Sequence, residues 1–319
     1  MKNTIYLFTF ILFSKLTFGQ NSTKIITTDI DNFWIAYDSV KTTKDSSKQV
    51  QFIQKLYFEK ATVGFKDFIE LREFTAREHL ENILLYPKFW ESIRSKTLDI
   101  KQNVAEIEEI FKKYKVLYPD FIEPSVYFTI GNLNSGGTVS SNRILIGSEI
   151  SCADKTTDAS ELSNWLKNVF KLNTSVISMV AHEIGHTQQK IEERDNENKS
   201  NVLANTLAEG MCDFLAELVY KPISQPYTIY GNKNEYEIWL KFKQEMYGEE
   251  LVNWLYNGSE APNGNADLGY FVGAQICKSY YTYAKDKKKA IKTIIELKNS
   301  PKELEKFLKK SKYNGGLKN

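Results

Sequence analysis

Two of the three histidines in this 319-residue chain lie within one helical turn, in the segment Val180–Gln189 with the sequence VAHEIGHTQQ. His182 and His186 are four residues apart, so on a helix both side chains project from the same face and can bind one metal ion. Glu183 then lies beside the open coordination position of that metal. In so histidine-poor a chain, composition alone produces an HExxH sequence on the order of once in a thousand. The spacing therefore predicts a helix that carries half of a zinc site.

A catalytic zinc site normally has three protein ligands and one open position. No histidine follows His186, which excludes a third histidine ligand from the downstream chain. The segment Leu207–Phe214 instead places Glu209 and Asp213 four residues apart in an otherwise apolar helical pattern. Two buried carboxylates so close together are costly without a cation. We therefore predict Glu209 as the third zinc ligand and Asp213 as the acceptor that orients a ligand histidine.

Other residues compete for the ligand position. The remaining acidic candidates are Glu192, Glu193, Glu197 and Glu217. Glu209 and Asp213 could also form an exposed acidic stripe, and Cys212 could close the fourth position and make the site structural. The sequence favours Glu209 because its helix, its apolar setting and its acidic partner one turn later all suit a ligand.

Apart from the alternative in which Cys212 is a ligand, the third histidine and the cysteines are interpreted as packing residues. His79 has no convergent partner and is predicted to be a packing or surface residue. Cys152, Cys212 and Cys277 are too few to staple a chain of this length, and allow at most one disulfide. They are predicted to be small buried apolar residues.

The N-terminus has the three-part pattern of a secretory signal. A basic start precedes an apolar run from Thr4 to Phe13, and a cleavage position follows Gly19. The run is shorter than the roughly 20 residues of a membrane-spanning helix, and no later segment is apolar enough to span a membrane. We predict a signal peptide over residues 1–19 and a periplasmic or secreted protein, with an uncleaved anchor as the alternative.

Composition and pattern predict a mainly α protein of the α+β class. A hydrophobic content of 42% suffices for a sizeable core, and a net charge of +2 indicates no nucleic-acid partner. We expect one domain over residues 20–319, with a helical part over about 20–120 and a metal-binding core over about 121–319. Ser125–Ile130 and Arg143–Gly147 are predicted strands of a small antiparallel sheet, joined by a glycine-rich loop. The edge of this sheet could hold an extended peptide, or the sheet could be plain core.

The HExxH segment followed by ExxxD at Glu209 to Asp213 resembles the gluzincin zinc peptidases. More narrowly, nearly the whole mature chain resembles a bacterial family of zinc-dependent proteases of uncharacterised substrate, related to the gliding-motility lipoprotein B family. The other stretches that carry this resemblance are Asp29–Trp34, Tyr118–Asp120, Ser135–Thr138 and Leu268–Gly273. The resemblance implies a zincin-like catalytic core and suggests Tyr270 as a donor to the developing oxyanion, with plain core packing as the other interpretation of this tyrosine. The lipid-attachment cysteine of the motility relative is absent here.

A zinc ion on His182, His186 and Glu209 would activate a water molecule, and Glu183 would serve as the general base. We therefore predict an exported zinc metallopeptidase that acts on a peptide or protein substrate. One alternative is a cell-envelope assembly or gliding-motility factor with a structural or vestigial zinc site. Another is zinc-dependent hydrolysis of a non-peptide substrate.

Overall fold

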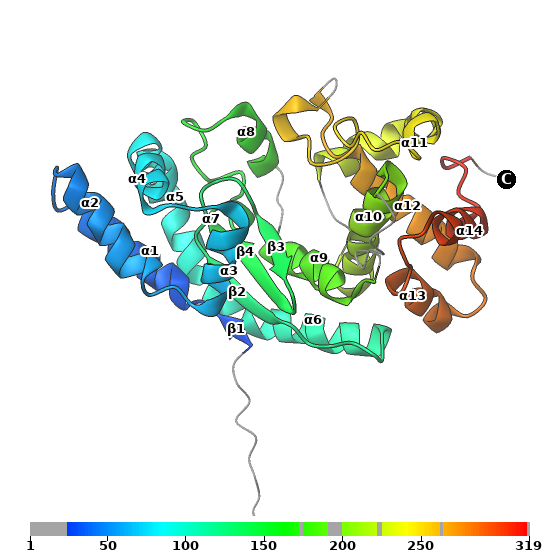
Figure 1. Cartoon of the computed structure of the whole chain (residues 1–319), viewed down its shortest axis with the longest axis horizontal. Helices are drawn as coiled ribbons and strands as arrows, with labels where there is room; N and C mark the ends of the chain where they lie inside the picture. Colours follow the sequence, from blue (N-terminus) through cyan, green and yellow to red (C-terminus); the bar gives the residue numbers. More distant parts are fainter. Residues whose placement is uncertain (1–23, 172–174, 191–199, 222–224, 262–263, 318–319) are drawn as a thin grey trace, which may run out of the picture.

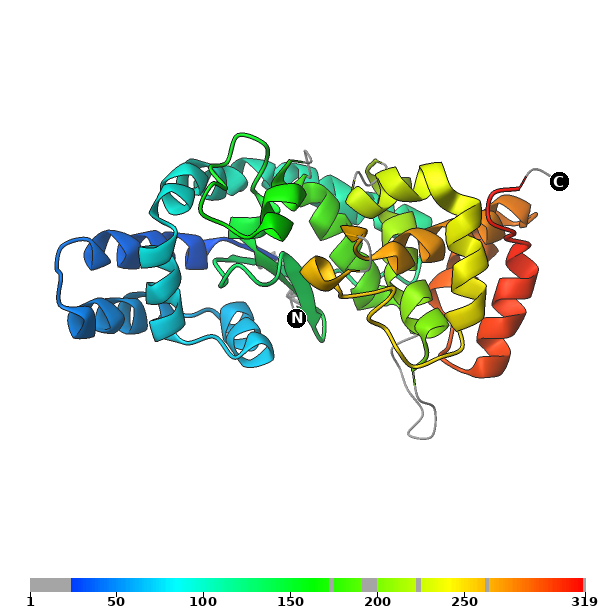
Figure 2. The ribbon, with the colours of Figure 1, turned by 90° about the horizontal axis from the view of Figure 1, so that it is seen from above.

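A computed structural model describes residues 24–171, 175–190, 200–221, 225–261 and 264–317. The predicted signal peptide, residues 1–19, lies outside these ranges. A small sheet lies between the helices of residues 28–98 (α1 to α5), on the left of Figure 1, and the helices of residues 176–311 (α9 to α14) on its right, whereas α6 (Val104–Leu117) runs below α9 (Val176–Gln188) and contacts it. The view from above in Figure 2 likewise places the first and the last helices at opposite ends of the molecule. The predicted mainly helical character is confirmed. Within the described residues, no helix combines the length and apolar character needed to cross a bilayer.

The N-terminal half is helical, as its apolar residues at three- and four-residue spacing predict. Its helices are α1 (Thr28–Val40), α2 (Ser46–Ile53), η1 (Gln54–Phe58), α3 (Val63–Arg72), α4 (Ala76–Leu85), α5 (Pro87–Leu98), η2 (Asp99–Asn103) and α6 (Val104–Leu117). Local signals start several of them: Thr75 and Glu78 form a capping box at α4, and Pro87 occupies the first turn of α5. Phe33 and Trp34 of α1 are buried in the aromatic core of this half.

His79 lies in this N-terminal core, far along the chain from the other two histidines. Its ring packs against Phe58 and Phe74, and its nitrogens lie within hydrogen-bond distance of the carbonyl oxygens of Thr75 and Ile130. The prediction that His79 is a packing residue agrees with this setting. Burial lowers the pKa of His79 to about 4, because the aromatic surroundings disfavour the imidazolium.

The buried His79 makes stability fall as pH falls. Between an unfolded pKa of about 6.5 and the folded value, the unfolded chain binds more protons, so the free energy of unfolding decreases on acidification. We expect His79→Gln to remove about 2 kcal/mol of the decrease between pH 7 and pH 5. Urea unfolding of both proteins at the two pH values measures this difference. An identical pH dependence of the two proteins would show that His79 does not titrate as its burial requires.

The sheet consists of β1 (Ile25–Ile26), β2 (Ser125–Thr129), β3 (Gly137–Ser140) and β4 (Arg143–Gly147), in the order β1-β2-β4-β3. Both predicted strands are present, but the prediction of an antiparallel sheet is wrong in part. β2 pairs in parallel with β1 and with β4, whereas β3 pairs antiparallel with β4.

The sheet is mixed because the glycine-rich segment between the predicted strands is not entirely a loop. It contains β3, which runs back along the sheet and is joined to β4 by a two-residue turn at Ser141 and Asn142. Ser141 has a φ of 55°, as a tight hairpin turn of this kind requires. After this reversal β4 points in the same direction as β2, so the two can pair only in parallel.

The C-terminal half is again helical. Its elements are α7 (Ser148–Ser151), α8 (Asn164–Phe170), α9 (Val176–Gln188), α10 (Val202–Val219), α11 (Pro226–Glu245), η3 (Gly258–Glu260), α12 (Leu268–Tyr283), α13 (Lys287–Ile295) and α14 (Pro301–Ser311). α10 lies between α9 and α12 and is buried along most of its length, which is why its sequence is apolar on nearly every side. α9 packs against α10 on one side and against β3 and β4 on the other. The HExxH helix is thereby held between the sheet and α10.

Candidate metal centre

The HExxH segment lies on α9, as predicted. Ser175 accepts a hydrogen bond from the Ile177 amide and caps the helix, and the apolar residues Val180 and Ile184 are buried. Gly185 allows α10 to approach closely, because a Cβ atom at this position would lie 2.8 Å from the Cys212 sulfur. This close approach brings the acidic residues of α10 to the histidine face of α9.

Three side chains meet where α9 faces α10. The Nε2 atoms of His182 and His186 are 3.1 Å apart. Glu209 Oε2 lies 3.1 Å from Nε2 of His186 and 3.4 Å from Nε2 of His182. Ligand atoms about 2.0–2.2 Å from a tetrahedral zinc ion are separated by roughly 3.3 Å, so the donor atoms match the triangle that such an ion requires. These residues fit a zinc ion in both donor type and spacing.

Each imidazole is oriented from its other nitrogen. Nδ1 of His182 lies 2.7 Å from Asp213 Oδ1, which can accept a hydrogen bond from Nδ1–H. Nδ1 of His186 lies 2.7 Å from Nε2 of Gln189, and the amide must turn its oxygen to this position when Nε2 of His186 binds a metal, because only the oxygen accepts from Nδ1–H. The other oxygen of Asp213 accepts a hydrogen bond of 2.9 Å from the Tyr227 hydroxyl. Such partners fix the tautomer and the ring orientation of histidine ligands. Both Nε2 atoms are therefore directed toward Glu209.

The electrostatics of the cluster suit a cation. Burial alone would lower the pKa of His182, but the carboxylates of Asp213 and Glu209 outweigh it and hold this pKa well above its usual value. Burial acts to raise the pKa of Glu209, yet His186 and His182 outweigh it and hold that pKa well below its usual value. The carboxylates thus stabilise positive charge between the two helices, and a divalent cation supplies such charge while binding neutral imidazole.

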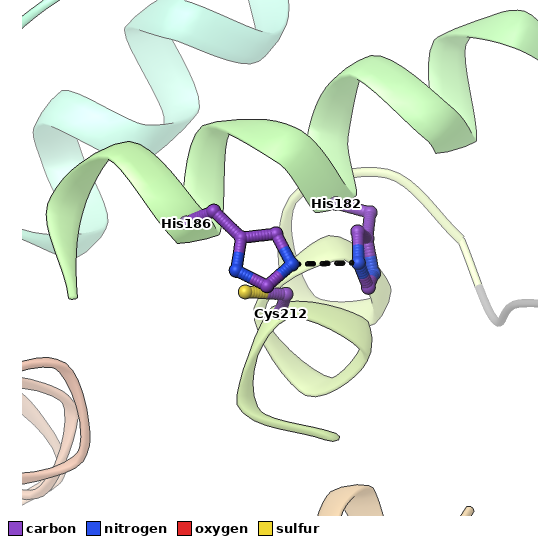
Figure 3. Close-up of side chains that lie close together, drawn as sticks. All are labelled: His182, His186 and Cys212. Carbon is purple, nitrogen blue, oxygen red and sulfur yellow. Dashed lines mark hydrogen bonds between the residues drawn. The ribbon is translucent and has the colours of Figure 1, made fainter. Parts of the chain in front are cut away.

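Cys212 offers a competing ligand. His182, His186 and Cys212 each have a ligand atom within 4.8 Å of the other two, so this group could also hold a metal. In Figure 3, however, the sulfur lies beside the His186 ring, on the side away from the line that joins the two Nε2 atoms. The thiol is 3.4 Å from the Ala208 carbonyl oxygen, and burial raises its pKa, which disfavours the thiolate that binds metals. We prefer Glu209 as third ligand because its oxygen contacts both Nε2 atoms.

Glu183 lies beside this cluster and faces β3. A Cβ atom at Gly137 of β3 would lie 2.6 Å from Glu183 Oε1, so a larger residue at this position would displace the carboxylate. Glu183 is buried, and this burial raises its pKa, although His186 and His182 offset part of the effect. A carboxylate of raised pKa is a better proton acceptor than an exposed one. Glu183 and His182 also line a cavity of about 790 Å³.

Tyrosines surround the metal cluster. The ring of Tyr270 stacks on His182 with centroids 6.1 Å apart, and it contacts the rings of Tyr227 and Tyr256. Tyr270 thus lies at the site, where its predicted role as oxyanion donor stays a prediction. Tyr256 donates a hydrogen bond of 2.6 Å to Glu209 Oε1, the oxygen that does not face the histidines. Its backbone has a φ of 57°, a strained conformation of a kind that often occurs at functional sites.

We expect Tyr256→Phe to weaken zinc binding by about 10–100-fold, the usual effect of removing a hydrogen-bond partner of a ligand. The reason is that Glu209 Oε1 loses its donor while the ring is retained. Titration of zinc against a chelating dye measures the affinity. Tyr247→Phe is the control, because it removes a hydroxyl from a tyrosine of similar exposure, 56% against 59% for Tyr256. Equal zinc affinities for the two variants and the wild type would contradict a positioning role for Tyr256.

Among the other acidic candidates, only Glu217 belongs to the described residues. Glu217 accepts a hydrogen bond from Lys278 at the surface, and Glu192, Glu193 and Glu197 lie outside the described residues. Cys152, Cys212 and Cys277 are free thiols. Tyr227, Tyr256 and Gln189 were absent from the predicted site. Gln189 could have been found from its spacing, since it follows His186 by three residues at the end of α9, whereas no sequence signal marks the two tyrosines.

Fold and site together define a mainly helical protein with a candidate metal site of histidine and carboxylate or thiol groups. The family model of the gliding motility protein GldB matches residues 19–315, so the chain belongs to the gliding motility protein GldB family. No curated protein and no solved structure shows a significant match. The predicted relation to gliding-motility lipoproteins is thus confirmed, while no protease family was matched. The zincin-like core stays a prediction.

Proposed function

We propose that this member of the GldB family is an exported zinc-dependent peptidase. The observation that carries the proposal is the triangle formed by the Nε2 atoms of His182 and His186 and by Glu209 Oε2. Glu183 and His182 line a cavity beside this triangle, and a catalytic site needs a base and room for a substrate near the metal. A purely structural site would normally present a fourth protein ligand at that position instead.

The residues of the site divide the chemistry between them. Zinc bound here would supply Lewis acidity to the scissile carbonyl and to the attacking water. Glu183 would accept the proton of that water and transfer it to the leaving amine, as a general base next to the metal does. Asp213 keeps the His182 ring in the orientation that directs Nε2 toward the ligand cluster.

The sheet edge beside Glu183 supports a peptide as substrate. β3 ends the strand order and pairs with β4 along one side, and no described strand covers its other side. An extended peptide can add to such an edge through backbone hydrogen bonds. Because β3 passes Glu183 at Gly137, a peptide bound along this edge would run close to the base.

We expect peptide hydrolysis to depend on bound metal. The purified protein, loaded with one equivalent of zinc, is incubated with a mixture of unstructured peptides, and mass spectrometry identifies the products. A chelator should abolish the cleavage, and one equivalent of zinc should restore it, because the Lewis acid is part of the reaction. Cleavage that persists after complete removal of zinc would contradict the proposal.

The second candidate is a motility or cell-envelope factor in which the metal has a structural role. Two observations favour it: the family match itself and the presence of Cys212 in the group that could hold a metal. In this case zinc would stabilise the packing of α9 on α10 without any hydrolysis. A zinc-bound sulfur together with an absence of peptide cleavage would identify this candidate.

A further inference from the structure

The cavity beside the metal cluster has a volume of about 790 Å³. Ligand-binding cavities commonly have about 300–1,000 Å³, so this one can accommodate more than a single side chain. His182 and Glu183 form part of its wall, next to the candidate reaction centre. Whatever binds in the cavity therefore lies against the base.

Six large apolar side chains line the cavity away from the metal cluster, among polar ones. They come from α7, α8, α9 and α11, and are Ile150, Trp165, Val169, Met179, Ile229 and Tyr230. Ile229 and Tyr230 are partly exposed, at 44% and 36%. A large apolar side chain of a bound peptide would cover them.

Lysines line the same cavity from three separate segments. Lys171 follows α8, Lys221 follows α10, and Lys233 belongs to α11. All three are exposed, and within the described ranges none of them forms an ion pair with an acidic side chain. Lys171 donates a hydrogen bond to Asn168, and the ammonium group of Lys221 lies over the Tyr220 ring. The cavity thus carries positive charge that the described fold does not neutralise.

The acidic residues of the cavity wall lie at the metal cluster and have other partners. Asp213 interacts with His182 and Tyr227, and Asp267 accepts a hydrogen bond from the Asn257 amide. Glu183 is the third, and it is the candidate base. Negative charge is therefore concentrated at the candidate metal, while the lysines present positive charge elsewhere along the wall. This distribution favours a substrate with an anionic group at a distance from the scissile bond.

We infer that the substrates are peptides that carry a large apolar side chain and, close to it, a carboxylate. This inference rests on the proposed peptidase function, since it assigns the specificity of the same site. The apolar wall binds the side chain, and Lys171, Lys221 and Lys233 attract the carboxylate. An acidic side chain and a free C-terminus present the same chemistry, and matched peptides distinguish these two sources.

The test compares fluorescein-labelled peptides of identical length with one leucine beside Glu, Gln or Lys, each with a free or an amidated C-terminus. Binding is measured by anisotropy on the metal-free protein, and cleavage on the zinc-loaded protein. We expect a peptide that carries a carboxylate to bind several-fold more tightly than the amidated Gln peptide, which carries none. High salt should reduce this difference in affinity. If Glu strengthens binding only as a side chain, in the amidated peptide, the bound carboxylate is an acidic side chain. If the free C-terminus strengthens binding in the Gln peptide, the bound carboxylate is the C-terminus.

A double charge reversal, Lys221→Glu with Lys233→Glu, should invert the preference so that the Lys peptide binds best. Lys241→Glu with Lys243→Glu is the matched control, because these two exposed residues belong to the same helix α11, lie outside the cavity wall and give the same change of net charge. This control should keep the wild-type preference. Inversion by both the double variant and the control would show a long-range charge effect and overturn the proposal, as would an unchanged preference of the double variant.

Binding and cleavage separate this inference from the proposed function. Selective binding without any cleavage of the zinc-loaded protein would sustain the specificity of the cavity and refute the peptidase. Cleavage without any effect of the peptide carboxylate on binding would sustain the peptidase and refute the specificity. If none of the peptides binds or is cleaved, both are wrong.

Discussion

Glu183→Gln is expected to reduce peptide hydrolysis by roughly 10²–10⁴-fold, the usual contribution of a general base. The amide cannot accept the proton of the attacking water, although it has nearly the same size and can occupy the same position beside Gly137. Zinc content should stay at the wild-type level, because Glu183 is not one of the predicted ligands. Rates of cleavage and metal analysis of the same preparations measure the two effects.

The control for this variant is Glu217→Gln, which changes an acidic residue that pairs with Lys278 at the surface. It should retain both zinc and activity. A Glu183→Gln protein that keeps its zinc and cleaves peptides at the wild-type rate would refute the assignment of Glu183 as base. Loss of zinc from this variant would instead show that Glu183 supports the metal.

Glu209→Gln is expected to weaken zinc binding more than the loss of a ligand's hydrogen-bond partner does, which is about 10–100-fold. The replacement removes the negative charge that faces both imidazoles but preserves the size of the side chain. Asp213→Asn should weaken zinc binding by about 10–100-fold, because Asp213 is a hydrogen-bond partner of a ligand and not a ligand itself. Cys212→Ala should bind zinc nearly as tightly as the wild type does. Titration of zinc against a chelating dye ranks the three variants.

The opposite order would reassign the third ligand. If Cys212→Ala loses zinc and Glu209→Gln retains it, the sulfur is the ligand and the site is a structural one. Circular dichroism of each metal-free protein shows whether a variant is folded, which matters for Cys212 because its side chain is fully buried against Gly185.

Much of the candidate site could be predicted because its main residues form two pairs, each with the four-residue spacing that places both side chains on one face of a helix. His182 and His186 share one face of α9, and Glu209 and Asp213 share one face of α10, whatever the rest of the fold does. The apolar sequence around the two acids indicated a buried helix, so their charges required a partner. The approach of the two helices, made possible at Gly185, then brings the predicted side chains together.

The parts that escaped prediction depend on tertiary structure. Tyr227 and Tyr256 reach the cluster from segments far from α9 in the sequence, and tyrosine is too common in this chain to mark a site. The strand β3 begins at the glycine pair Gly136 and Gly137 and ends at the turn residues Ser141 and Asn142, which favour a loop, and its pairing with β4 makes it extended. The parallel pairing of β2 with β4 follows from that hairpin, which local sequence pattern does not specify.

The most direct test of the account is X-ray absorption spectroscopy at the zinc edge of the protein loaded with one equivalent of zinc. The account predicts nitrogen and oxygen ligands at about 2.0–2.2 Å and no sulfur, as expected for two histidines, Glu209 and an exchangeable position. A sulfur ligand at about 2.3 Å would place Cys212 in the coordination sphere and contradict the open catalytic site.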